Sequence, residues 1–194
     1  MRPARPRDAA SLVLWRAGPE GPEVLMGRRS SRHRFLPDMF VFPGGRLDAE
    51  DYARIKGALR PEVARRMALH VEARKAAALG AAAIRETEEE TGLKLEHLGQ
   101  LDYVARAITP PTSPIRFHGR FFFADAGATE GTLGGSGELI DLAFRPIRVS
   151  LALRVADITE FILGEIDRLL GAPGEKPAAI FWHYRNGRRI VSHD

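Results

Sequence analysis

Three glutamates at helical spacing, directly before a glycine, constrain this chain more than any other feature. The segment from residue 80 to 93 reads GAAAIRETEEETGL and places Glu86, Glu89 and Glu90 at i, i+3 and i+4. If the segment is helical, these offsets bring three carboxylates to one face within about one turn. Like charges at this spacing repel, and the C-terminal end of a helix also disfavours anions. The cluster therefore predicts a cation site, and oxygen donors favour Mg²⁺ or a similar hard divalent ion.

The neighbours of this trio favour a binding site over the commoner alternative, a solvated helix face. Arg85 lies next to Glu86 and four residues before Glu89, where its guanidinium group can hold a carboxylate in one rotamer. Gly92 is placed to end the helix as a left-handed cap. The sequence thus predicts a helix over about 76–91 with one acidic face.

A second unusual element, FVFPGG at 40–45, predicts a strand that enters a Pro-Gly-Gly turn. The missing side chains of this turn let the backbone approach a ligand. Guanidinium groups match phosphate geometry, so the basic residues just before the turn suit a polyphosphorylated ligand, with a solvated loop as the open alternative. Nucleic acid is not expected, because no basic stripe with interleaved aromatic residues accompanies them. The basic residues are Arg28, Arg29, Arg32, His33 and Arg34.

Together these elements resemble the signature of the Nudix hydrolases. That family's box reads G, five residues, E, seven residues, REUxEExGU, where U is a bulky aliphatic residue. RETEEETGL at 85–93 matches the second half except at Thr87, and Gly45 matches the opening glycine. Asp51 stands where the family has Glu. Asp51 and Arg85 are separated by 33 residues instead of seven, so about 26 residues are inserted and the role of Asp51 is left open.

The resemblance implies an α/β fold of the Nudix type, an α/β/α sandwich with a mixed sheet. It implies a single domain over 1–194 with a helical insertion at about 52–79. The pattern along the chain agrees, because short strands mixed with helices favour an α/β arrangement. We predict strands at 11–16, 23–28, 39–42, 98–107, 116–124 and 139–144, a helix at 151–170, and a hairpin turning at Asn186-Gly187.

The resemblance also implies metal-dependent hydrolysis of the diphosphate linkage in a nucleoside diphosphate derivative, with Mg²⁺ or Mn²⁺ as the cofactor. By the family pattern Glu86, Glu89 and Glu90 would hold the metal. Arg85 would orient these carboxylates, and the backbone carbonyl near Gly44 would add a ligand.

A longer upstream pattern resembles Nudix enzymes that act on coenzyme A, which carry an approximate LLTxRSxxxRxxxGxxxFPGG. Arg29, Ser30, Arg34 and FPGG at 42–45 match it. The long insertion in the box and the downstream TPPTSPIRFHGRFFFA also look like the coenzyme A diphosphatase branch. Coenzyme A or acyl-coenzyme A, cleaved to 3′,5′-ADP and 4′-phosphopantetheine, is thus the favoured substrate. The upstream pattern is broken at Met26, Gly27 and Asp38.

The same resemblance suggests the substrate contacts. Arg29 and Arg34 would meet phosphate, and the Gly44-Gly45 turn would approach the ligand. Arg116, which borders the TPPTSP loop, would meet a nucleotide or an acyl-pantetheine arm. Two alternatives stay open: the same chemistry on ADP-ribose, dinucleotides or other nucleoside diphosphates, and a non-catalytic module that senses a nucleotide.

Two further assignments rest on local sequence. Two sources of the general base stay open, the box and a later loop. Glu138 after the flexible GGSG is the candidate in the later loop, with an exposed loop acid as the alternative. Phe117 and Phe121 fall in an alternating strand, and we expect both in the core.

Composition limits the remaining function classes. The 194 residues include no Cys, which excludes disulfides and thiolate chemistry and fits a cytoplasmic location. No apolar run approaches the roughly 20 residues that span a bilayer, so no membrane partner is expected. The net charge of +4 says little by itself. Nudix proteins are often dimers, so a homodimer is an open expectation.

Overall fold

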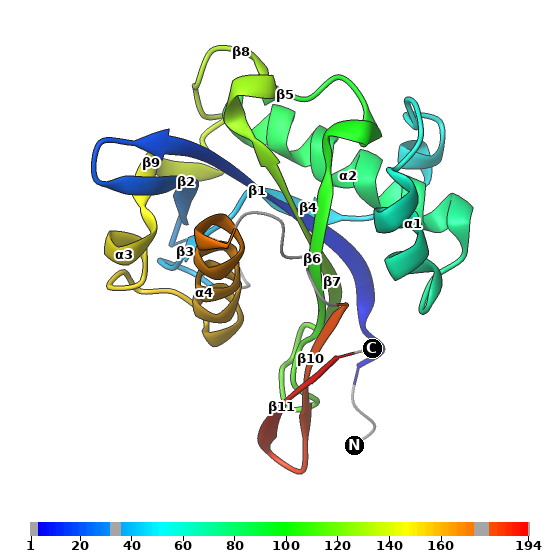
Figure 1. The fold of residues 1–194 in the computed structure, drawn as a ribbon. Coiled ribbons are helices and arrows are strands. Elements are labelled where there is room, and N and C mark those ends of the chain that lie inside the picture. The colour runs from blue at the N-terminus through cyan, green and yellow to red at the C-terminus, as the bar shows by residue number, and fades with distance from the viewer. Residues whose placement is uncertain (1–3, 32–35, 173–178, 194) are drawn as a thin grey trace.

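The structure is a computed structural model that describes residues 4–31, 36–172 and 179–193 (Figure 1). A mixed sheet of nine strands forms its centre, in the order β11-β10-β6-β7-β1-β2-β3, with β4 paired to β1 and β9 paired to β2. A separate two-stranded ladder joins β5 and β8. The strands are β1 (Arg7–Gly18), β2 (Gly21–Arg29), β3 (Phe40–Val41), β4 (Gly44–Arg46), β5 (Leu93–Lys94), β6 (Asp102–Ile108), β7 (Phe117–Asp125), β8 (Glu130–Gly131), β9 (Leu139–Pro146), β10 (Ile180–Arg185) and β11 (Arg188–His193).

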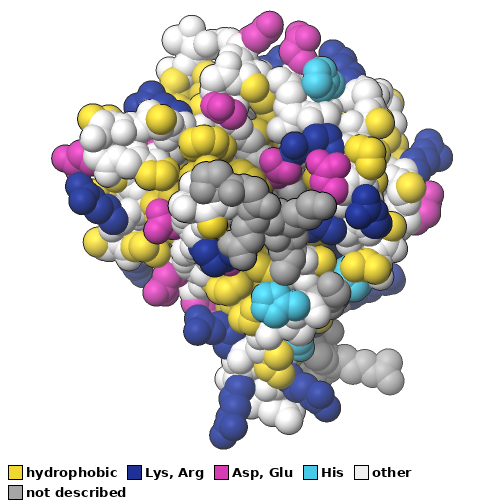
Figure 2. All heavy atoms as spheres, in the orientation of Figure 1, with side chains coloured by type: hydrophobic (Ala, Val, Ile, Leu, Met, Phe, Trp, Pro, Cys, Tyr) yellow, Lys and Arg dark blue, Asp and Glu magenta, His cyan; other side chains and the backbone are white. Residues whose placement is uncertain are grey.

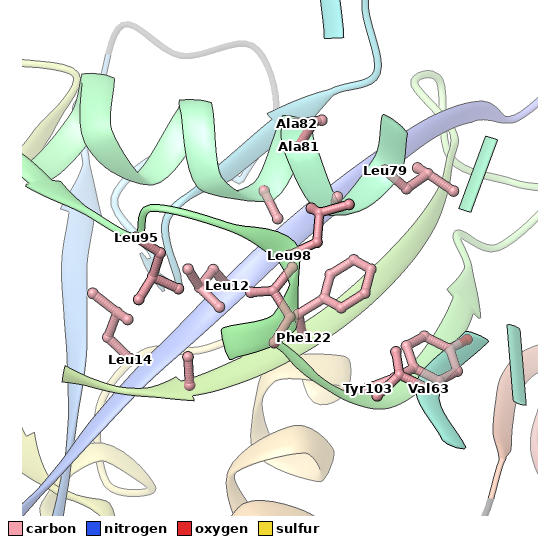
Figure 3. Close-up of a cluster of buried hydrophobic side chains, with 14 of the residues drawn as sticks. Leu12, Leu14, Val63, Leu79, Ala81, Ala82, Leu95, Leu98, Tyr103 and Phe122 are labelled. Carbon is pink, nitrogen blue, oxygen red and sulfur yellow. The ribbon is translucent and has the colours of Figure 1, made fainter. Parts of the chain in front are cut away.

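Helices cover both faces of this sheet (Figure 1). Alternate residues of β1 point to opposite faces, so Leu12 packs under α2 whereas Val13 packs against α4. The cluster between the sheet and α2 is drawn in Figure 3. This layering confirms the predicted α/β/α sandwich. The helices are α1 (Pro61–Ala68), α2 (Ala73–Thr91), α3 (Ile147–Ser150) and α4 (Asp157–Gly171), and short 3₁₀ turns lie at Ala49–Tyr52, Leu98–Gln100 and Ala126–Ala128.

The segment predicted to be an insertion, about 52–79, contains α1 and about the first two turns of α2. Pro61 is the first residue of α1, where its missing N–H costs nothing. Val63 and Met67 are buried in the cluster shared with α2, so this segment is part of the hydrophobic core. In Figure 3, Val63 lies beside Tyr103 of β6.

Some predicted boundaries were wrong. The helix predicted at 151–170 begins at Asp157, because the chain before it is extended, with Val155 bridged to Phe40 of β3. The strand predicted from residue 98 begins at Asp102, after the Leu98–Gln100 turn. The predicted hairpin is confirmed, with Asn186 and Gly187 both at positive φ as a tight turn requires. No helix among the described residues is long and apolar enough to cross a bilayer.

Candidate active site

The predicted acidic face forms the C-terminal half of α2, which ends at Gly92 in the left-handed conformation as predicted. Glu90 is only 5% exposed, and Glu86 is largely buried. The side chain of Glu89 is 54% exposed. The three carboxylates therefore share a helix face but differ in how far they are removed from water.

Arg85 connects the acidic face to the base of the insertion. Its Nη1 donates to Glu86 Oε1 at 2.9 Å and to Glu89 Oε2 at 3.0 Å. Its Nε and Nη2 donate to the two carboxylate oxygens of Asp51, at 2.7 and 3.1 Å. The hydrogen bonds that Arg85 donates to Asp51, with the charges of Glu86 and Asp51, raise the pKa of Arg85, so the guanidinium stays charged. It can therefore hold two carboxylates in fixed rotamers, which is the orienting contact predicted for it.

Asp51 is the residue whose role the sequence left open. It is completely buried and also accepts a hydrogen bond from the backbone N–H of Asp48 at 2.8 Å. Its pairing with Arg85 brings together two parts of the box that are 34 positions apart in the chain. The two ends of the predicted insertion therefore lie together in space. The sequence signal for this pairing was the spacing of Asp51 from Gly45, which fits the family pattern.

The glycine turn of β4 touches the acidic face directly. The backbone N–H of Gly44 donates to Glu90 Oε2 at 2.8 Å, which fixes that carboxylate. A Cβ atom on Gly45 would lie only 2.2–2.5 Å from the carboxylate atoms of Glu86. Glycine at 45 is thus a condition for the position of Glu86. The backbone carbonyl near Gly44 as a metal ligand stays a prediction.

Gly45→Ala is expected to displace the Glu86 carboxylate and to lower turnover about 100-fold or more, since misplacement by about 1 Å can cost that much. Steady-state hydrolysis with circular dichroism as a fold check measures this. Gly164→Ala on α4, where a Cβ meets no atom within 4 Å, is the control and should keep full activity. Equal activity of both variants would contradict the proposed contact.

The electrostatics of the acidic face fit a bound cation. Burial raises the pKa of Glu90 to about 7, the charges of Glu86 and Glu138 add to this, and the Gly44 N–H and the charge of Arg29 oppose it. Burial likewise raises the pKa of Glu86, against the lowering effect of Arg85. Carboxylates whose charged form is disfavoured by burial are hard oxygen donors that a divalent ion would stabilise.

The metal set predicted from the sequence is not a closed cage. In the described ranges, no three or more His, Asp or Glu side chains gather tightly enough to enclose an ion. This arrangement suits Mg²⁺, which usually keeps several waters and binds through one or two carboxylates together with substrate phosphates. The roles of Glu86, Glu89 and Glu90 as metal ligands stay predictions.

A pocket of about 660 Å³ opens beside the acidic face, on the side of the sheet that α4 covers. Glu86, Glu90 and Glu138 line its acidic end, together with Arg29 at the end of β2. The Nε atom of Arg29 is buried without a hydrogen-bond partner among the described residues, and its charge acts on Glu90. The volume is in the range of small-molecule sites.

Other predicted residues have different positions. Arg116 donates to the carbonyls of Thr109 and Ala4, at 3.1 and 2.8 Å, and is not among the pocket residues. Phe117 and Phe121, expected in the core, both line the pocket, although Phe121 also packs against the core. Arg34 lies outside the described residues.

Sequence reasoning missed the far end of the pocket. Trp182 of β10 and the first residues of α4 form it. No sequence motif links these segments to the box. They follow it in the chain, and the strand pairing of the folded sheet places them at the same pocket.

Solved structures of known proteins share this fold. A Nudix hydrolase from Alicyclobacillus acidocaldarius is 27% identical, with a TM-score of 0.69 over 86% of this chain and 93% of that one. The Nudix domain of Shewanella oneidensis NrtR, solved with ADP ribose, is 14% identical, with a TM-score of 0.56 over 86% and 90%. A C. elegans Ap4A hydrolase in a binary complex is 16% identical, with a TM-score of 0.52 over 85% and 98%. No family model matches the sequence.

The last two similarities, at such low identity, show the fold alone. Together with the first they establish that the chain has the Nudix fold. The similarity to the Alicyclobacillus enzyme, joined to the acidic helix and its arginine, identifies the chain as a hydrolase of the Nudix type.

Proposed function

We propose that this Nudix-type hydrolase cleaves the diphosphate linkage of a nucleoside diphosphate derivative, with Mg²⁺ or Mn²⁺ as cofactor. The observation that carries the proposal is the pair of Glu90, which is buried, and Glu86, which is partly buried, at one end of a pocket of ligand size, with the pKa of both raised. A diphosphate repels hydroxide through its own negative oxygens, so its cleavage needs positioning and charge neutralisation.

Each residue of the acidic end has a task in this proposal. Glu86 and Glu90 would hold the ion, which when bound neutralises phosphate charge and makes a coordinated water more acidic. Arg85 keeps the Glu86 rotamer, and the Gly44 N–H keeps that of Glu90. Glu138 is the candidate base, since it lines the pocket and its charge acts on both carboxylates. It would take the proton of the attacking water.

For the substrate we favour coenzyme A or acyl-coenzyme A, giving 3′,5′-ADP and 4′-phosphopantetheine. Arg29 supports this choice, because its guanidinium group reaches the pocket and lies close enough to act on Glu90. ADP-ribose and dinucleotides are the alternative, because the NrtR domain was solved with ADP ribose and an Ap4A hydrolase shares the fold. A single domain over 1–194, a homodimer and a cytoplasmic location stay predictions.

Turnover of a panel tests the function. The chain is incubated with Mg²⁺ or Mn²⁺ and coenzyme A, ADP-ribose or diadenosine tetraphosphate, and products are identified after hydrolysis in ¹⁸O-labelled water. We expect metal-dependent cleavage of at least one compound and little with Glu86→Gln. Tight binding of these compounds without any cleavage would instead support a nucleotide sensor.

Arg29→Ala is expected to raise KM for coenzyme A about tenfold or more, because a charge-assisted contact to phosphate is lost. KM for ADP-ribose should change much less if Arg29 meets the 3′-phosphate. Arg28→Ala is the matched control, since Arg28 pairs with Asp38 at 3.3 Å and does not line the pocket. Equal effects on both substrates would remove the coenzyme A assignment.

A further inference from the structure

The floor of the pocket is a row of small residues that runs across the sheet from the acidic end. Ala9 of β1 is in register with Gly119 of β7, and Gly119 is in register with Ala107 of β6. Ala107 is in register with Trp182 of β10. All four residues line the pocket, so the row is a trough, called here the Ala9–Trp182 trough. Three strand spacings give it a length of roughly 14 Å.

The trough begins at the diphosphate end. Ala9 pairs with Arg46 of β4, and the next residue of β1 pairs with Gly45, which touches Glu86. A group attached to a diphosphate at the acidic end would therefore extend over Ala107 and Gly119 toward the indole. Ala107 has only a methyl group and Gly119 has no side chain, which leaves the space that such a group needs.

Trp182 closes the trough and is held there by its neighbours. Its residue is only 2% exposed, and its ring packs edge-on against Tyr184, with centroids 5.1 Å apart. The Tyr184 hydroxyl donates to Asp157 Oδ2 at the start of α4. This hydrogen bond ties the C-terminal hairpin to the helix that forms the other wall. Figure 1 shows the hairpin extending from the sheet next to α4.

The chemistry of this end selects an uncharged group. Asp157 is the only charged residue among the described residues that line it, and its carboxylate would repel a phosphate. The indole Nε1–H is buried and has no acceptor in the described part of the chain, so a donor at this wall lacks a partner. The apolar walls are Pro110, Phe117, Phe121 and Ile158.

We propose that the Ala9–Trp182 trough binds the uncharged organic arm of the substrate, and that Trp182 determines specificity by contacting an amide or heterocycle at the end of that arm. Both groups offer a flat face to the indole ring and an acceptor to its N–H. A nucleobase and a pantetheine chain are the two sources of this chemistry. The inference rests on the proposed function, because the diphosphate at the acidic end sets where the arm begins.

Fluorescence of Trp182 tests this directly. The chain has two tryptophans, so Trp15→Phe leaves Trp182 as the single indole reporter. This variant is titrated, with Mg²⁺ present, with inorganic pyrophosphate, ADP and 4′-phosphopantetheine, and binding is followed in parallel by calorimetry. We expect a saturable change in emission with ADP or with phosphopantetheine, which identifies the arm, and none with pyrophosphate.

The outcomes separate this inference from the proposed function. Calorimetric binding of ADP and phosphopantetheine without an emission change overturns the trough, and so does a complete lack of binding. An equal response to pyrophosphate overturns it as well. An arm-dependent emission change without turnover of any diphosphate keeps the trough and contradicts the hydrolase function.

Trp182→Leu should raise KM for the preferred substrate about tenfold or more, while kcat changes less than about twofold, because the arm lies away from the reacting bond. Tyr184→Phe should raise KM by a smaller factor, since the ring stays but the bond to Asp157 is lost. Phe181→Leu is the matched control, because Phe181 belongs to the same strand and does not line the pocket. An equal KM for Trp182→Leu and Phe181→Leu would remove the specificity role.

Discussion

Asp51→Ala is expected to lower the free energy of unfolding by about 3–5 kcal/mol, the range for breaking a buried ion pair from one side. The loss is large because Arg85 is itself buried and would lose both of its hydrogen bonds to a buried carboxylate. It would keep Glu86 and Glu89 at 2.9 and 3.0 Å and the half-exposed Asp48 at 4.0 Å. Urea denaturation followed by circular dichroism measures the change. Turnover should fall as well, since the guanidinium group that fixes both glutamates loses its own anchor.

Glu50→Gln is the matched control for this variant. Glu50 lies on the same 3₁₀ turn, but its side chain is 62% exposed and pairs with Arg54 at 3.6 Å. Exposed pairs of this kind contribute roughly 0–1 kcal/mol. If Asp51→Ala lowered the free energy of unfolding as little as Glu50→Gln, the ion pair of Asp51 with Arg85 would not be what stabilises this part of the fold.

The contact of Asp51 also shows what the sequence could and could not predict. Spacing alone placed Glu86, Glu89 and Glu90 on one face and Arg85 beside them, because such offsets are properties of a single helix. The contact between Asp51 and Arg85 depends on tertiary structure. A motif that matches only with a long gap does not tell whether the residues on either side of the gap meet in space.

Residues after the box were harder still. Alternation along β7 predicted Phe117 and Phe121 in the core, whereas both line a pocket and only Phe121 also packs against the core. Whether a face meets a helix or a cavity depends on where α4 begins, and Asp157 was not recognised as that point. Trp182 gives no local signal, because an aromatic residue in a strand is most often core.

Glu90→Gln is expected to lower turnover by about a thousandfold, the scale seen when one group that stabilises transition-state charge is removed. Glu90 is the most buried carboxylate of the acidic face, and the Gly44 N–H fixes its position. The amide keeps the shape but is a weaker ligand for a hard cation. Single-turnover hydrolysis at saturating Mg²⁺ measures the loss.

Glu88→Gln on the same helix is the matched control for activity. Its side chain pairs with Lys94 at 2.9 Å and does not line the pocket. Near-normal turnover is expected, and the ratio between the two variants is the quantity of interest. A large loss in both would point to the helix as a whole and not to the carboxylate of Glu90.

Glu90→Gln should also raise the free energy of unfolding at pH 8 when no divalent ion is present. Burial raises the pKa of Glu90 from 4.5 to about 7, so the folded chain binds this proton more tightly than the unfolded chain. Protonated Glu90 therefore makes its full contribution to the free energy of unfolding below pH 4.5. This contribution is lost as the pH rises through about 7. The loss amounts to roughly 3 kcal/mol, because one pKa unit corresponds to about 1.4 kcal/mol.

Thermal unfolding in chelator at pH 5 and pH 8 separates the two contributions of Glu90. The unsubstituted chain should lose stability between these pH values by more than Glu90→Gln does. Added Mg²⁺ should then restore stability at pH 8 in the unsubstituted chain and much less in the variant, because an ion that binds the folded state stabilises it. If both proteins responded equally to pH and to Mg²⁺, the ionised Glu90 carboxylate would not be where the cation binds.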